Sequence, residues 1–179
     1  IDPADARDHD DAVYAEADTD TKNKGGHVII VAIADVAHYV RPNSLLDREA
    51  QLRGTSVYFP DRVVPMLPEK ISNDLCSLRE SEDRPCLAVR MIYDAEGNKR
   101  SHTFMRALMR SPAKLSYQEA QAAIDGKPEP KCAPLLDSAL KPLWAAYAAL
   151  KSARDRREPL DLDLPERKIL LDKEGRIAD

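Results

Sequence analysis

Residues 27–34 read His27-Val28-Ile29-Ile30-Val31-Ala32-Ile33-Ala34 and contain the longest apolar run of the chain. Branched Val and Ile side chains favour extended backbone, and an apolar run without polar alternation is typical of a strand covered on both faces. The run of seven apolar residues is far shorter than the roughly 20 that a membrane-spanning helix needs. It therefore predicts a central strand in a hydrophobic core and no membrane span.

Strand signals lie on both sides of this run. A short β-type stretch at residues 12–17 precedes it across a polar loop that ends in Gly25-Gly26. Residues 86–93 and 100–110 follow it as two further stretches, joined by a turn that contains Gly97. Two strands with a short glycine-containing connection favour an antiparallel hairpin.

Helix signals occupy the remaining parts of the chain. Ser44 and Ser116 have the spacing of N-caps, each with an acidic residue three positions later, and apolar residues recur at helical spacing near the C-terminal end. These patterns predict helices over residues 45–53, 116–126 and 135–157. We expect an α+β fold, with a mixed, largely antiparallel sheet flanked by helices.

The composition favours a folded protein domain and excludes several other classes of protein. The chain has 179 residues, 43% of them hydrophobic, and a net charge of −4 at pH 7, which favours a folded domain over a disordered one and argues against a polyanion-binding surface all round. The three cysteines have no Cys-x-x-Cys spacing, so we expect neither a disulfide framework nor a zinc knuckle, and we expect cytoplasmic residence. The chain starts without Met and stops just after a turn-like segment, so we interpret residues 1–179 as an excised fragment.

The opening segment is the candidate for chemistry, because five of its first eleven residues are Asp. Two carboxylates about 4 Å apart repel each other by about 4 kcal/mol at an effective dielectric constant of 20. Either these side chains spread into water, as most charge runs do, or a cation holds them together. The segment leads directly into an apolar strand, and Pro3 restricts its path, so a bent, cation-binding loop is the sharper hypothesis.

The residue types limit which cation such a loop binds. A calcium-binding EF-hand loop that starts at Asp8 would need Gly and Glu where the chain has Val13 and Thr19. No Cys lies nearby, and His9 is the one candidate nitrogen ligand in the segment. Oxygen ligands favour Mg²⁺ or Mn²⁺ over zinc, and Mg²⁺ commonly pairs a few carboxylates with a substrate phosphate.

Four sequence blocks in a fixed order carry a resemblance to a known family. They are Ile1-Asp2 with Asp8-His9-Asp10-Asp11-Ala12, the block Ile33-Ala34-Asp35-Val36-Ala37-His38-Tyr39-Val40, the block Ser56-Val57-Tyr58-Phe59-Pro60, and the run from Pro65 to Leu78. The ordered set resembles the catalytic domain of the ribonuclease II / ribonuclease R family. Residues 57–62 resemble the ribonuclease R branch more closely.

The resemblance implies a processive 3′→5′ exoribonuclease that hydrolyses RNA to 5′-mononucleotides with Mg²⁺, for which Mn²⁺ is a possible substitute. It implies that Asp2, Asp8 and Asp11 position metal and that loss of Asp10 abolishes cleavage but spares binding. Tyr58 corresponds to a tyrosine that stacks on the 3′-terminal region of single-stranded RNA, and DNA is not expected as the main substrate.

The resemblance also concerns the extent of the domain. Residues 1–179 would form the N-terminal portion of the exoribonuclease catalytic domain, without the OB-type RNA-binding modules that flank it in the family. An arginine that helps to hold the scissile phosphate lies in the later part of the family's domain. We therefore expect the fragment alone to be inactive.

Simpler explanations compete at several positions. Tyr58 could be an ordinary core residue of a strand, and Asp35 and His38 are best explained as structural hydrogen-bonding residues because no nucleophile accompanies them. The cationic side chains between Glu96 and Glu119 fit a phosphate-binding stripe and a solvated sheet face equally well. A non-catalytic RNA-binding relative, or a structural divalent-ion site in a protein that is not a nuclease, are the alternatives for the whole chain.

Overall fold

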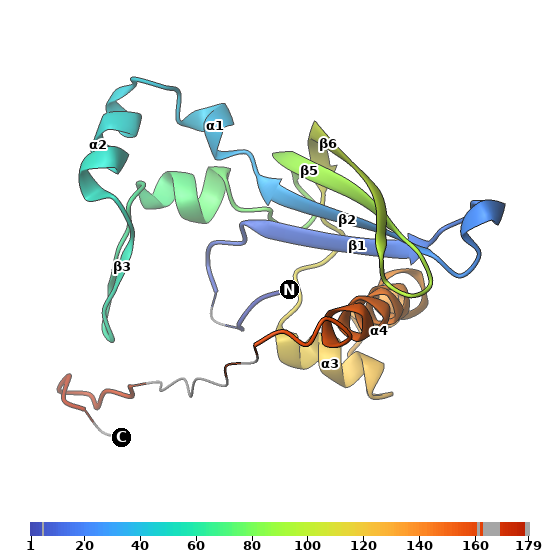
Figure 1. Ribbon diagram of the computed structural model, residues 1–179. Coiled ribbons are helices and arrows are strands. Elements are labelled where there is room, and N and C mark those ends of the chain that lie inside the picture. Colours follow the sequence, from blue (N-terminus) through green and yellow to red (C-terminus); the bar gives the residue numbers. More distant parts are fainter. Residues whose placement is uncertain (5, 161, 163–168, 178–179) are drawn as a thin grey trace.

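The computed structural model describes residues 1–4, 6–160, 162 and 169–177. Its centre is a sheet in the order β1-β2-β5-β6, in which every neighbouring pair is antiparallel (Figure 1). The strands are β1 (Asp11–Ala17), β2 (His27–Ala34), β5 (Asp83–Tyr93) and β6 (Lys99–Arg110). The predicted α+β class, the central position of residues 27–34 and the hairpin are therefore confirmed.

A second group of elements lies beyond the end of β2. It contains the short helix α1 (Val36–Tyr39), helix α2 (Leu45–Arg53), the two-stranded hairpin of β3 (Val57–Tyr58) and β4 (Val63–Val64), and the π-helical turn η2 (Lys70–Leu75). As predicted, α2 begins after Ser44, whose hydroxyl accepts a hydrogen bond from the Asp47 amide at 3.2 Å. Ile71, Cys76 and Leu78 pack with Ala34 in one hydrophobic cluster, which fixes η2 against the end of β2.

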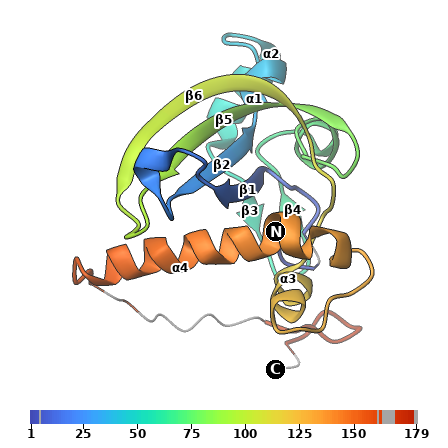
Figure 2. The same ribbon diagram turned by 90° about the vertical axis from the view of Figure 1, so that its right-hand side faces the viewer.

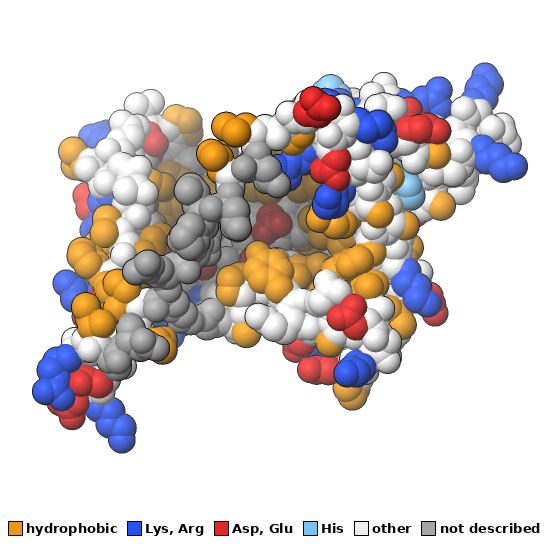
Figure 3. All heavy atoms as spheres, turned by 60° about the horizontal axis from the view of Figure 1, so that its bottom comes forward, with side chains coloured by type: hydrophobic (Ala, Val, Ile, Leu, Met, Phe, Trp, Pro, Cys, Tyr) orange, Lys and Arg blue, Asp and Glu red, His pale blue; other side chains and the backbone are white. Residues whose placement is uncertain are grey.

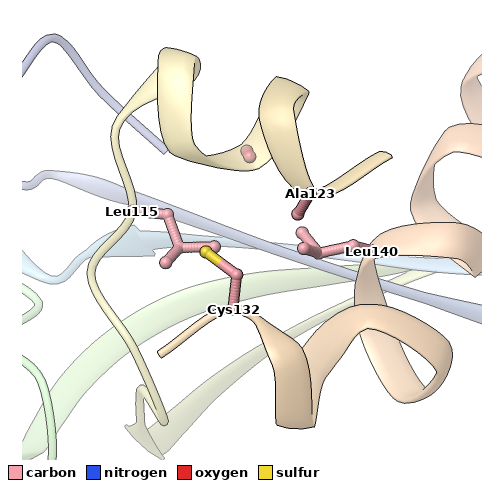
Figure 4. Close-up of a cluster of buried hydrophobic side chains, with 5 residues drawn as sticks. Leu115, Ala123, Cys132 and Leu140 are labelled. Atoms are coloured by element: carbon pink, nitrogen blue, oxygen red, sulfur yellow. The ribbon is translucent and has the colours of Figure 1, made fainter. Parts of the chain in front are cut away.

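The C-terminal helices pack against the β1 side of the sheet. They are α3 (Tyr117–Ile124), the single turns η3 (Ala133–Leu135) and η4 (Leu136–Leu140), and the long helix α4 (Lys141–Asp155). Figure 2 shows α4 running beneath the sheet, where Ala146 packs with Ala15 and Ile29. A separate cluster of Leu115, Ala123, Cys132 and Leu140 joins α3 to the start of this helical segment (Figure 4).

The helix that the sequence predicts over residues 135–157 is present, but its first turns are not α-helical. Residues 136–140 form a π-helical turn before α4 begins. Pro142 is the second residue of α4, and proline has no backbone N–H and crowds the carbonyl four residues earlier. The irregular start is therefore a local consequence of this proline.

The expectation that β2 is covered on both faces holds for only part of the strand. Ile33 is 46% exposed, although its neighbours Ala32 and Ala34 are buried. Val13, Leu87 and Phe104 lie on the same face of the sheet as Ile33 by their pairing register and are exposed too. The sequence pattern correctly predicted that β2 lies inside the sheet. It was wrong in predicting that both faces of the strand are covered near Ile33.

One short helical turn remains to be described. The 3₁₀ turn η1 (Thr21–Asn23) lies in the loop between β1 and β2. Among the helices of the described residues, none combines the length and the apolar character that a membrane span requires.

Candidate metal centre

The acidic segment, residues 1–11, is bent because distant parts of the chain hold its two ends. At the first end, the Asp2 amide donates a hydrogen bond to the Leu115 carbonyl at 3.1 Å, and the Tyr117 amide donates to the Asp2 carbonyl at 3.1 Å. Asp2 and Ser116 thereby form an isolated parallel bridge. The start of the segment is attached to the N-terminus of α3.

The second end is attached to the segment that follows η2 and to the sheet. The His9 amide donates to the Ser77 hydroxyl at 3.2 Å, and the Leu78 amide donates to the His9 carbonyl at 2.7 Å. The Asp10 carbonyl accepts a hydrogen bond from the Ala34 amide at 2.8 Å. The sequence alone suggested a bend here, and these contacts are what produces it.

The bend brings two of the four candidate carboxylates to one cavity. Asp2, His9 and Asp11 contribute to the lining of a cavity of about 320 Å³, whose other walls are largely apolar. Figure 3 shows a hollow with acidic side chains at depth and hydrophobic side chains around it. Asp8 and Asp10 are exposed and are not among the residues that line the cavity.

The pKa values report how the carboxylates influence one another. Burial raises the pKa of Asp11, and the nearby negative charges of Asp2 and Asp10 raise it further. For Asp2, burial is the largest influence and would raise the pKa, but the hydrogen bond from His9 acts in the opposite direction and the pKa is lowered overall. Asp2, Asp10 and Asp11 therefore form one electrostatic group.

The arrangement of these side chains is only partly that of a metal site. Their oxygen donors suit a hard divalent cation. Within the part of the chain that the structure describes, however, no three His, Cys, Asp or Glu side chains are already placed to hold one ion. In this arrangement Asp2 and Asp11 alone do not make a complete ligand set, because Asp8 and Asp10 do not line the cavity.

Tyr58 lies on the β3–β4 hairpin and not in the core. It is 69% exposed, so the interpretation of this residue as an ordinary core tyrosine is wrong. Phe59 follows it, and the Arg62 guanidinium lies 4.8 Å from the centre of the Phe59 ring. The hairpin presents an exposed aromatic side chain that is available for stacking.

Glu119 secures the attachment of Asp2 to α3. It completes a capping box with Ser116, whose amide donates to the Glu119 carboxylate at 2.6 Å. Lys131 forms an ion pair with the other Glu119 oxygen at 2.6 Å. The ion pair and the Ser116 hydrogen bonds lower the pKa of Glu119 to about 2 against desolvation, which acts in the opposite direction.

We expect the replacement Glu119→Gln to destabilise the protein most at neutral pH. Because the folded-state pKa lies below the unfolded-state value, the ionised carboxylate stabilises the fold above about pH 4.5, and this contribution disappears as the pH falls toward 2. Gln retains the capping hydrogen bond, so the difference isolates the charge and should reach about 1 kcal/mol, given the partial exposure of the pair. Urea unfolding between pH 3 and 7 measures it, with Glu129→Gln as the control, and a pH-independent difference would contradict this assignment.

Comparisons with known proteins identify the family of this chain. A family model described as the RNB domain matches residues 1–179. The chain belongs to the RNB domain family. Ribonuclease R of Vibrio parahaemolyticus is 45% identical to this RNB domain over 179 residues, which are 99% of this chain and 21% of the relative. The chain thus spans about a fifth of the length of that relative.

Solved structures support the same assignment. RNase R of Mycoplasma genitalium, determined in complex with double-stranded RNA, is similar to this RNB domain with a TM-score of 0.88 and 33% identity, over 97% of this chain and 30% of that one. Yeast Ssd1, described as a pseudonuclease, has a TM-score of 0.65 at 18% identity, over 82% of this chain and 17% of that one. The second similarity concerns the fold alone.

Sequence reasoning missed the residues of the RNB domain that hold the acidic segment. Ser77 and Leu115 lie far from it in sequence, and no local pattern marked them as its partners. Asp35 is structural, as predicted, but its partner was not foreseen. Arg106 Nε donates to the Asp35 carboxylate at 2.8 Å and joins the end of β2 to β6.

Proposed function

We propose that the chain is the N-terminal portion of the catalytic domain of a hydrolytic exoribonuclease, which degrades RNA processively from the 3′ end to 5′-mononucleotides. The observation that carries the proposal is the bent acidic segment, in which Asp2 and Asp11 line one cavity and Asp10 adds its charge to theirs. The similarity to proteins named ribonuclease R supports it. This combination favours phosphodiester hydrolysis over simple RNA binding.

The proposed roles of the aspartates are those that the family resemblance implies. Asp2, Asp8 and Asp11 position Mg²⁺, which Mn²⁺ can replace, and Asp10 is the carboxylate without which cleavage fails. When bound, the metal would activate water and offset the charge on the departing 3′ oxygen. The chain's own contribution is to hold the carboxylates against their mutual repulsion, through the hydrogen bonds at Asp2 and His9.

The proposed substrate is the 3′ end of single-stranded RNA, with DNA a poor substitute. RNase R of Mycoplasma genitalium has been solved with a ribose-methylated single-stranded RNA, which supports RNA as the ligand. Tyr58 would stack on the 3′-terminal region. Stacking of a base on an aromatic ring contributes about 1–3 kcal/mol and is tolerant of sequence, which suits an enzyme that degrades RNA without sequence preference.

The remaining proposals concern the protein as a whole. Catalysis would need the later part of the domain and the flanking OB-type modules that the family resemblance implies, so we expect residues 1–179 alone to be inactive. We also propose a cytoplasmic location, in keeping with three buried, free cysteines.

A non-catalytic relative is the alternative with a specific observation in its favour, because the same fold occurs in the pseudonuclease Ssd1. The presence of all four aspartates argues against it, since carboxylates near a phosphate backbone weaken binding unless a cation offsets them. Single-stranded RNA labelled at either end, incubated with the natural full-length protein and Mg²⁺, distinguishes the two. We expect early release of labelled 5′-mononucleotide from the 3′-labelled RNA alone, and binding without any cleavage would overturn the proposal.

The stacking role of Tyr58 has its own expected outcome. The replacement Tyr58→Ala in the full-length protein should change the length of the shortest end product more than the overall rate, because the ring holds only the last nucleotides of a shrinking substrate. Gel analysis of the end products measures this. Tyr147→Ala, which truncates an exposed tyrosine on α4, is the matched control, and an unaltered product ladder for Tyr58→Ala would refute the stacking role.

A further inference from the structure

Among the described residues of the acidic segment, His9 is the most buried polar side chain, and one of its ring nitrogens has no partner. The residue is 6% exposed, and Nε2 is the one buried side-chain nitrogen or oxygen without a hydrogen bond among the residues that the structure describes. A buried polar atom that lacks a partner costs about 1–3 kcal/mol. We therefore looked for a contact of the same ring that offsets this cost.

The other ring nitrogen supplies a specific contact. His9 Nδ1 lies 2.8 Å from Oδ2 of Asp2. A carboxylate oxygen accepts, so Nδ1 carries the proton and donates. This bond joins the two ends of the acidic segment through their side chains, and it leaves Oδ1 of Asp2 outside the His9 contact.

The backbone of His9 keeps the ring in place. Its amide and its carbonyl are both bonded to the segment that follows η2, through Ser77 and Leu78. The ring itself contributes to the wall of the cavity that Asp2 and Asp11 also line. Because the backbone amide and carbonyl of His9 are both hydrogen-bonded, its ring has a fixed position from which it can orient a neighbouring carboxylate.

We infer that His9 is a positioning residue that orients the carboxylate of Asp2 through the Nδ1–H to Oδ2 hydrogen bond and so prepares Asp2 to bind a divalent cation. The inference rests on the proposed function for the role of the cation, but the hydrogen bond itself does not. A nucleophile-activating role is not supported, because no Ser or Cys in the described residues is hydrogen-bonded to Nε2.

Two substitutions separate positioning from mere packing. Asn places an amide nitrogen as many bonds from Cβ as His Nδ1, whereas Gln places its amide nitrogen at the position of Nε2. In the natural full-length protein, we expect His9→Gln to weaken Mn²⁺ binding about 10-fold or more, as loss of an outer contact to a metal ligand commonly does. His9→Asn should stay within about 3-fold of the wild type, on the same principle of a retained outer contact.

Calorimetric titration with Mn²⁺ alone measures these affinities, with thermal unfolding of each variant in parallel. His38→Gln, which changes an exposed histidine on α1, is the control and should bind Mn²⁺ like the wild type. Equal affinities for His9→Gln and wild type, or equal losses for the Gln and Asn variants, would overturn the positioning role. Absence of Mn²⁺ binding by the wild-type protein would instead refute the proposed function.

A metal-free measurement tests the hydrogen bond even where a variant fails to fold. Nitrogen-15 NMR of the imidazole side chains in the wild-type protein without metal should show His9 with its proton on Nδ1. The Nε2–H tautomer at His9 would overturn the inference whatever the titrations give.

Discussion

Replacing Asp10 with Asn in the natural full-length protein is expected to reduce release of 5′-mononucleotides at least about 100-fold, the lower range for loss of a group that acts directly on the reacting atoms. Affinity for single-stranded RNA should remain nearly unchanged. Asp10 is exposed, and its backbone carbonyl is bonded to the Ala34 amide, so Asn preserves the fold and removes only the charge. That charge raises the pKa of Asp11 and belongs to the electrostatic group of the candidate site.

Mononucleotide release from labelled RNA and a filter-binding assay measure the two quantities side by side. Asp137→Asn is the control, because it removes the same charge at an exposed ion pair with Lys141 on the helical segment. It should leave both quantities unaltered. Undiminished cleavage by Asp10→Asn would refute the role assigned to Asp10.

The second large effect is expected from Gly97→Ala, which should lower the free energy of unfolding by about 2–5 kcal/mol. Gly97 has a φ of +81°, where a side chain costs about 1–2 kcal/mol. A Cβ atom there would lie 2.2 Å from the Ala149 carbonyl oxygen, and such overpacking costs about 1–3 kcal/mol more. The turn between β5 and β6 packs directly on the backbone of α4, which cannot yield like a flexible side chain.

Gly54→Ala separates the two contributions. Gly54 has a similar φ of +74°, but no atom lies within 4 Å of the Cβ that Ala would add. Its loss of stability should therefore be limited to the backbone cost of about 1–2 kcal/mol. Urea unfolding of both variants gives the comparison, and equal losses would show that α4 does not press against the turn.

Local sequence signals were sufficient for the elements themselves. The N-cap at Ser44 and the stop at Gly54 predicted α2 with its observed bounds, and the capping box of Ser116 and Glu119 predicted the start of α3. Such signals involve residues within one helical turn, so they do not depend on distant parts of the chain. The hairpin of β5 and β6 was predictable because a short glycine-containing turn joins its strands.

Contacts between distant segments were beyond the reach of these signals. The Asp-rich composition indicated a candidate metal site, but Ser77 and Leu115 hold it from far along the chain. The exposure of Ile33 was equally unpredictable. An apolar strand pattern does not reveal which parts of a sheet face other elements cover. The sequence marked His9 as a candidate nitrogen ligand among the aspartates, but its burial and its contact with Asp2 became visible only in the fold.

The central claim is that the acidic segment binds a divalent cation through its aspartates, and titration of the natural full-length protein with Mn²⁺ tests it most directly. The comparison is between the wild type, the double variant Asp2→Asn with Asp11→Asn, and Asp137→Asn. The account predicts saturable binding by the wild type and by Asp137→Asn, and at least about a 10-fold loss of affinity in the double variant. Equal Mn²⁺ binding by all three proteins, or none by the wild type, would contradict it.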